Sequence, residues 1–282
     1  MQRSLALVIG PGGILLISLV PRSTLRAQTP PDLERERHEF NQWLSSDPLS
    51  PYAALAIQPL GQGVSIGQEP ADIRLAIGGR ATARISGGSV VLETGTRRLV
   101  LPPGRPVALD SFRLIVSGPR GRETIAAFGT VRGYREARYY PYAPDLVRTV
   151  TLEPPERRGA FRTLGLDGAE TDATEAGIVE VAMGTTSTRL RVYRVGAPGD
   201  EEADLLILFR DATNGKGSYP AGRFVVLVPA AGGKFKLDFN RARNPFCAYN
   251  SAYACPAPWP GNGIAAPVAA GETYQGERHS AP

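Results

Sequence analysis

Polar side chains able to bind or react with a small molecule are concentrated between Leu205 and Glu272. Within this stretch the apolar run 205–209 ends abruptly at a polar turn, a common position for functional side chains. An arginine, carboxylates, amides and a tyrosine at this density predict charge-assisted hydrogen bonds to a small polar ligand. The candidate ligand-binding residues are Asp211, Thr213, Tyr219, Arg223, Asp238, Asn240, Asn244 and Glu272.

The same residues also suit an internal hydrogen-bond network. Asp211 and Thr213 can cap the turn after the apolar run by hydrogen-bonding its backbone. Arg223 can pair with Asp211 or Asp238 and hold two strands in register. Asp238 and Asn240 alternate with apolar neighbours, so they are expected on one face of a strand. The sequence leaves open whether these groups form a binding site or a rigid scaffold.

Catalysis by this set of residues would depend on carboxylates. Asp211, Asp238 or Glu272 can supply the acid and base of a hydrolase. The two histidines, His38 and His279, lie in the N-terminal segment and the C-terminal tail and do not adjoin the polar stretch, which disfavours a Ser–His–Asp triad. No cofactor signature is present, so no cofactor is expected. The sequence favours a non-catalytic protein that binds a small polar ligand or an envelope protein, and the alternative is a carboxylate-dependent hydrolase acting on an envelope substrate.

The two cysteines, Cys247 and Cys255, lie close together in sequence. Pairing in an oxidising compartment accounts for both thiols, so a disulfide is expected. Zinc would need further ligands, and neither histidine is nearby in sequence, so no metal site is predicted.

The first 27 residues have the composition of a secretory signal peptide. Arg3 precedes a mostly apolar run, and cleavage after Ala27 is expected. The run is short and interrupted by the segment 10–13, Gly-Pro-Gly-Gly, which argues against a membrane-spanning helix. The chain is therefore predicted to be exported to the periplasm or secreted, with no transmembrane segment after cleavage.

The net charge of +5 does not indicate a nucleic-acid partner. The predicted signal peptide carries three arginines and no acid, so it accounts for three units of this net charge. The lysines are few, and the remaining arginines form no basic stripe.

The rest of the chain combines one helical pattern with short β-type runs. Asp32 is expected to cap a helix over 33–45, with an apolar face that packs on the sheet that follows. The stretch 167–177 is predicted to be an acidic, Gly- and Ala-rich loop. The expected strands are 73–77, 81–85, 89–92, 97–101, 112–116, 123–128, 147–152, 178–183, 188–195, 205–209, 224–228 and 235–239.

The first group of strands resembles a forkhead-associated β-sandwich, because 63–68 reads Gly-Val-Ser-Ile-Gly-Gln and 71–75 reads Ala-Asp-Ile-Arg-Leu. In that family an Arg follows the Ile-Gly pair and helps to bind phosphothreonine. Gln68 stands at that position here, so the resemblance implies the fold without the phosphopeptide function.

A second resemblance spans most of the mature chain. It rests on a Tyr- and Pro-rich piece at 139–144, on Asn244-Pro245-Phe246-Cys247, on Cys255-Pro256 with the later Asn262, and on Ala270-Gly271-Glu272. With these pieces the chain resembles domain of unknown function family 1684, exported bacterial proteins of unassigned activity. Trp259 departs from the small residues and prolines usual there.

These patterns together predict a mainly β fold of two β-sandwich-like domains with a short N-terminal helix. The expected organisation is a signal peptide at 1–27, the helix and a linker at 28–47, the forkhead-associated-like sandwich at 48–133, a Tyr/Pro linking segment at 134–146, a second β domain with the polar motif and Cys loop at 147–274, and a flexible tail at 275–282.

Overall fold

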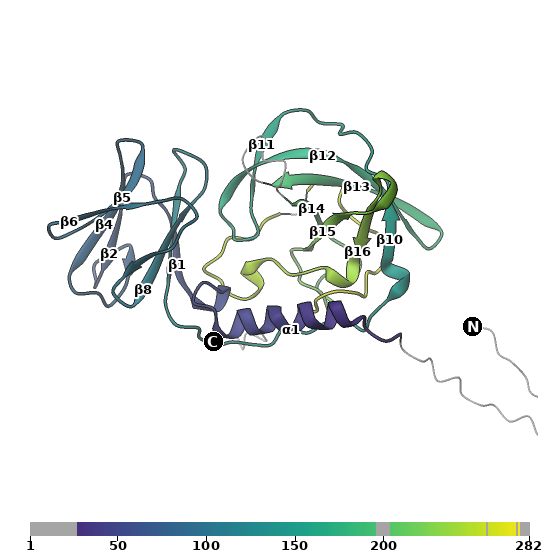
Figure 1. The fold of residues 1–282 in the computed structure, drawn as a ribbon, viewed down its shortest axis with the longest axis horizontal. Coiled ribbons are helices and arrows are strands. Elements are labelled where there is room, and N and C mark those ends of the chain that lie inside the picture. Colours follow the sequence, from purple (N-terminus) through teal and green to yellow (C-terminus); the bar gives the residue numbers. More distant parts are fainter. Residues whose placement is uncertain (1–26, 196–203, 258, 275, 277–282) are drawn as a thin grey trace, which may run out of the picture.

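The computed structural model describes residues 27–195, 204–257, 259–274 and 276. Almost all of the predicted signal peptide and of the predicted tail lies outside these residues. The predicted mainly β fold is confirmed: the described chain forms three sheets and one α-helix, α1 (Pro31–Ser46), arranged in two lobes (Figure 1). No described helix is long and apolar enough to cross a membrane.

The first lobe is a sandwich of two small sheets. One contains, in order, β1 (Ala54–Pro59), β9 (Thr124–Phe128), β8 (Phe112–Ser117) and β7 (Val107–Leu109). The other contains β3 (Ile73–Arg74), β2 (Val64–Gly67), β4 (Arg80–Ser86), β5 (Ser89–Thr94) and β6 (Arg97–Leu101). Alternate side chains of both sheets, such as Ile66, Leu92, Leu114 and Ile125, form one buried core, as expected for sheets packed face to face.

The second lobe is built on one antiparallel sheet of seven strands. Their order is β10 (Val147–Val150), β16 (Phe235–Asp238), β15 (Arg223–Pro229), β14 (Leu205–Phe209), β13 (Thr186–Val195), β12 (Glu170–Met183) and β11 (Ala160–Leu164). A backbone bridge between Glu153, just after β10, and Ile178 of β12 curls the sheet back on itself around a second core.

The loop predicted over 167–177 is wrong, because β12 begins at Glu170. In this strand Ala173 and Glu175 are buried and their immediate neighbours are not. The alternation was not recognised in the sequence because the residues involved are small or acidic and not large and apolar. Gly177 has a specific role here: a Cβ at this position would collide with the Glu153 carbonyl oxygen and the Leu152 side chain. The glycine therefore permits the close approach that closes the sheet.

The N-terminal helix is confirmed, but its start and its packing differ from the prediction. It begins at Pro31, whose fixed φ suits the first helical turn, and Asp32 pairs with Arg241 instead of capping. The aromatic residues Phe40 and Trp43 stack on each other and approach the chain at 246–249. Helix α1 therefore lies along the base of the second lobe, not on the sandwich that follows it in sequence (Figure 1).

Short 3-10 turns complete the connections. They occur at Pro51–Ala53, Pro144–Leu146, Ala231–Gly233, Phe239–Arg241 and Phe246–Ala248.

Candidate functional site

The Arg223 side chain is fully buried and ion-paired with Asp211. Its Nη2 donates to Asp211 Oδ2 at 2.9 Å and to the Val268 carbonyl oxygen at 2.8 Å. Its Nη1 donates to the carbonyl oxygens of Ala270 and Glu272. The Arg223 guanidinium thus joins the end of β14 and the start of β15 to the segment that carries Val268, Ala270 and Glu272. Its planar shape allows several hydrogen bonds of fixed direction at once.

Thr213 extends this buried network. Its backbone N and Oγ1 both donate to Asp211 Oδ1, at 2.8 and 2.6 Å, as in an Asx-type turn. Its Oγ1 also lies 2.7 Å from Ser218 Oγ, which in turn lies 3.4 Å from Tyr140 Oη. Asp211, Thr213 and Arg223 therefore belong to one buried network, in which only the Arg223 Nε has no hydrogen-bond partner among the described residues.

Asp238 and Asn240 form a separate cluster beside α1. Asp238 Oδ1 accepts hydrogen bonds from the backbone N and the Nδ2 of Asn240, both at 3.0 Å. Asn240 also exchanges hydrogen bonds with the backbone of Ala143, which fixes the linking segment to the end of β16. Arg241 completes the cluster, with Nε 3.5 Å from Asp238 Oδ2 and ion pairs to Asp32 and Glu36 on α1.

Asn244 and Glu272 meet in a third place, together with Tyr249. Glu272 Oε2 accepts from the Asn244 backbone N at 3.0 Å, and both carboxyl oxygens lie 2.7 Å from the Tyr249 hydroxyl. Burial raises the pKa of Glu272 to about 7, although the hydrogen bonds from Asn244 and Tyr249 oppose the rise. Burial and the neighbouring carboxyl also raise the pKa of Tyr249 well above its ordinary value.

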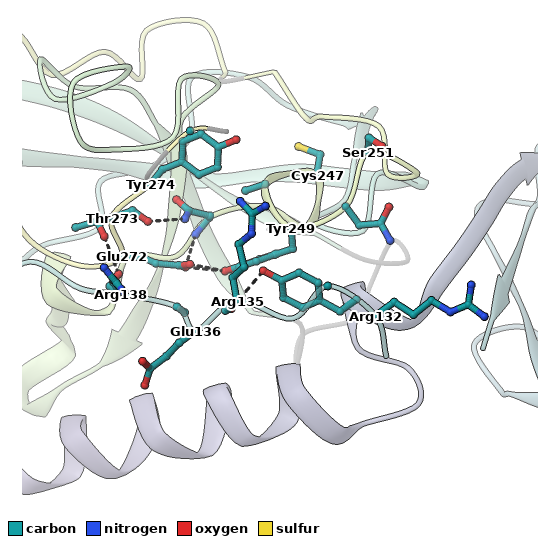
Figure 2. A pocket seen from close by; sticks show the side chains of 17 residues that line it. Arg132, Arg135, Glu136, Arg138, Cys247, Tyr249, Ser251, Glu272, Thr273 and Tyr274 are labelled. Atoms are coloured by element: carbon teal, nitrogen blue, oxygen red, sulfur yellow. Dashed lines mark hydrogen bonds between the residues drawn. The ribbon is translucent and has the colours of Figure 1, made fainter. Parts of the chain in front are cut away.

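A cavity of about 1000 Å³ lies above this third group (Figure 2). Of the eight predicted ligand-binding residues, only Asn244 and Glu272 line it. The other lining residues are Tyr52, Arg132, Gly133, Arg135, Glu136, Ala137, Arg138, Cys247, Ala248, Tyr249, Asn250, Ser251, Thr273, Tyr274 and Gly276.

Backbone and side-chain hydrogen bonds hold the wall at 132–138 in place. Asn41 of α1 accepts from the Ala137 N at 2.7 Å and donates to the Ala137 O at 3.2 Å. The Arg138 carbonyl oxygen accepts from both the backbone N and the Oγ1 of Thr273. Tyr52 Oη donates to the Arg135 carbonyl oxygen. The wall is therefore preorganised by α1, by the chain before β1 and by the C-terminal segment.

Three arginines of this wall, Arg132, Arg135 and Arg138, are exposed and were missed by the sequence analysis. In Figure 2 they follow one another between α1 and the opposite wall that carries Ser251 and Tyr274. Their spacing of three residues, across the boundary between the predicted sandwich and the linking segment, was the available signal.

The predicted disulfide between Cys247 and Cys255 is confirmed and braces the wall opposite the arginines. The Tyr219 hydroxyl lies 3.3 and 3.2 Å from the two sulfur atoms. Its ring packs edge-on against Tyr274, with centroids 4.7 Å apart. Tyr219 thus supports the cavity from behind and is not among its lining residues.

Two further residues that the sequence analysis named are structural in their contacts. Asn262 is buried, and its amide exchanges hydrogen bonds with the backbone of Arg191 at 2.8 and 2.9 Å. Trp259 packs on Tyr193, with ring centroids 4.0 Å apart, and its Nε1 donates to Thr163. Trp259 therefore fills the space beside β11 and β13.

Residues 132–273 match the family model described as Protein of unknown function (DUF1684). The chain belongs to this family. All cavity-lining residues except Tyr52, Tyr274 and Gly276 fall within the DUF1684 match.

One of the solved structures similar to this chain is that of a Haloarcula marismortui protein. The solution NMR structure of the uncharacterized protein from gene locus rrnAC0354 of Haloarcula marismortui is 30% identical in sequence, with a TM-score of 0.43, and the alignment covers 50% of this chain and 77% of that one. No curated protein matches the chain.

Proposed function

We propose that this chain is an exported, non-catalytic protein that binds a small polar ligand in the cavity beside Asn244 and Glu272. The observation that carries the proposal is the cavity itself, whose walls come from separate parts of the DUF1684 region and are fixed by α1 and the disulfide. Preorganised walls reduce the entropy cost of binding. The size also suits a small molecule.

In this proposal the buried residues Asp211, Thr213, Arg223, Asp238 and Asn240 are the scaffold and not the ligand contacts. Most of their polar atoms hydrogen-bond to one another and to backbone groups. Their hydrogen bonds hold in place the chain segments that form the walls. Asn244 and Glu272, by contrast, line the space that a ligand would occupy.

Export to the periplasm or beyond forms part of the proposal. Its support is the composition of the first 27 residues together with a disulfide, which persists in oxidising compartments. The first lobe is proposed to be a forkhead-associated-like sandwich without phosphopeptide binding, since Gln68 replaces the arginine that such binding requires.

A hydrolase is the second candidate, favoured by one observation. A carboxyl group with a pKa near 7 beside a cavity is suited to general acid–base catalysis. Asp211 and Asp238 do not line the cavity, so the second carboxyl of such an enzyme would be the exposed Glu136.

Native mass spectrometry of the mature protein, purified from its own cell envelope, tests the proposal. We expect a mass excess over the denatured protein. Ser251 is exposed on the cavity wall, so the ring of Ser251→Trp should project into the cavity, displace the ligand and remove the excess whatever the charge of the ligand. The matched control is Ser111→Trp, at an exposed turn of the first lobe, which should keep it. A wild type without any excess, or an excess that survives Ser251→Trp, would contradict binding in this cavity.

A further inference from the structure

The charge of the cavity wall indicates the chemistry of the ligand. Arg132 and Arg138 make no side-chain hydrogen bond or ion pair with other described residues, and both are exposed beside the cavity. Arg135 lies between them on the same wall. The carboxylates among the lining residues are the exposed Glu136 and the buried Glu272. Guanidinium groups match the geometry of carboxylate and phosphate, so an acidic group is expected at this wall.

The floor of the cavity presents a hydrogen-bond acceptor without a partner. Asn244 is 2% exposed, and its Oδ1 is buried with no hydrogen-bond partner among the described residues. The Glu272 carboxyl, beside it, already accepts from Tyr249. A buried acceptor without a partner costs about 1–3 kcal/mol, so a donor from the ligand would be favourable here. The arginines disfavour a ligand ammonium group, which leaves a hydroxyl as the expected donor.

Tyrosine rings supply the remaining surface. Tyr52, Tyr249 and Tyr274 are half-buried and line the cavity from three different chain segments. A tyrosine offers an apolar face and a polar tip, which suits a ring that carries both C–H and O–H groups. A volume of about 1000 Å³ leaves room for one or two such rings.

We propose that the ligand is an anionic sugar: a hydroxylated ring whose acidic group lies at the arginine-bearing wall beside Arg138 and whose hydroxyl groups face Asn244 and Glu272. This inference rests on the proposed function, because it assigns the ligand class of the same cavity. No bond is made or broken in the complex, and affinity comes from charge-assisted hydrogen bonds and contacts with the tyrosine rings.

Isothermal titration calorimetry on the full mature protein, with the disulfide intact, tests the ligand class. The probes are glucuronate and glucose 6-phosphate, with glucose as the uncharged counterpart and tetrahydropyran-2-carboxylate as the anionic ring without hydroxyl groups. We expect at least one anionic sugar to bind about tenfold or more tightly than either counterpart. Arg138→Ala should weaken that binding about tenfold, whereas Arg97→Ala, an exposed arginine on β6, should leave it unchanged.

The outcomes separate this inference from the proposed function. If glucose binds as tightly as the anionic sugars, or Arg138→Ala has no effect, the anionic class is overturned while binding in the cavity stands. If neither anionic sugar binds, the anionic-sugar assignment is overturned. A mass excess that is lost in Ser251→Trp would then still support ligand binding, whereas the absence of any excess would overturn both.

Discussion

The carboxyl group of Glu272 is where burial most clearly alters the chemistry of a residue beside the cavity. Its folded pKa of about 7 exceeds the ordinary value of 4.5, so the folded protein holds a proton that the unfolded chain releases between these pH values. Stability contributed by this group is therefore complete below about pH 4.5 and is lost as pH rises towards 7, by an amount on the order of 3 kcal/mol.

Glu272→Gln removes this titration while keeping an acceptor for Tyr249. We expect urea unfolding between pH 4.5 and 8 to show a smaller loss of stability with rising pH in the variant than in the wild type. The matched control is Glu136→Gln, an exposed carboxyl on the cavity wall, which should follow the wild-type curve. If Glu272→Gln also follows it, the carboxyl does not hold its proton in the folded state.

At the scale of elements, the Asp211–Arg223 pair joins β14 and β15 to the returning segment that carries Val268 and Ala270. Arg223→Ala would leave a buried, uncompensated Asp211 carboxylate and three carbonyl oxygens without their donor. We expect a loss of about 3–5 kcal/mol in the free energy of unfolding, measured by urea denaturation. The exposed Arg113 of β8 supplies the control, since Arg113→Ala should change stability by no more than about 0.5 kcal/mol. If Arg223→Ala changed the free energy of unfolding equally little, the Asp211–Arg223 pair would not stabilise the fold.

The sequence predicted the elements better than their assembly. Most strands follow from apolar runs bounded by turns, and the cysteine pair follows from composition. The location of the cavity does not, because its walls lie far apart in the chain: the backbone N and the Oγ1 of Thr273 both donate to the Arg138 carbonyl oxygen, across 135 residues. Local patterns also cannot tell an exposed Asp211 from one buried by a segment that returns more than fifty residues later.

On the scale of the whole molecule, the first lobe is an insertion between α1 and the DUF1684 region. The two ends of that lobe are adjacent: Ala54 pairs with Phe128, and the Gly129 N donates to the Ala53 carbonyl oxygen at 2.8 Å. Helix α1 belongs to the other lobe by its contacts, through the hydrogen bonds of Asn41 to Ala137 on the cavity wall and the ion pair of Glu36 with Arg243. Adjacent ends allow a lobe to be removed without stretching the rest of the chain.

We therefore expect the chain from Gln28 onward to fold when residues 54–128 are replaced by two glycines. Removal exposes the aromatic surface of Tyr253, which packs against Ala126 and Phe128, so stability should fall by about 2–3 kcal/mol. Circular dichroism should still show a cooperative thermal transition, and mass spectrometry the intact disulfide. A second variant that begins at Arg132 also loses α1, and with it the hydrogen bonds of Asn41 to the cavity wall. This shorter variant should show no cooperative thermal transition, because the aromatic residues that α1 covers are then exposed to water. A cooperative transition in this variant would mean that α1 is not needed to form the site.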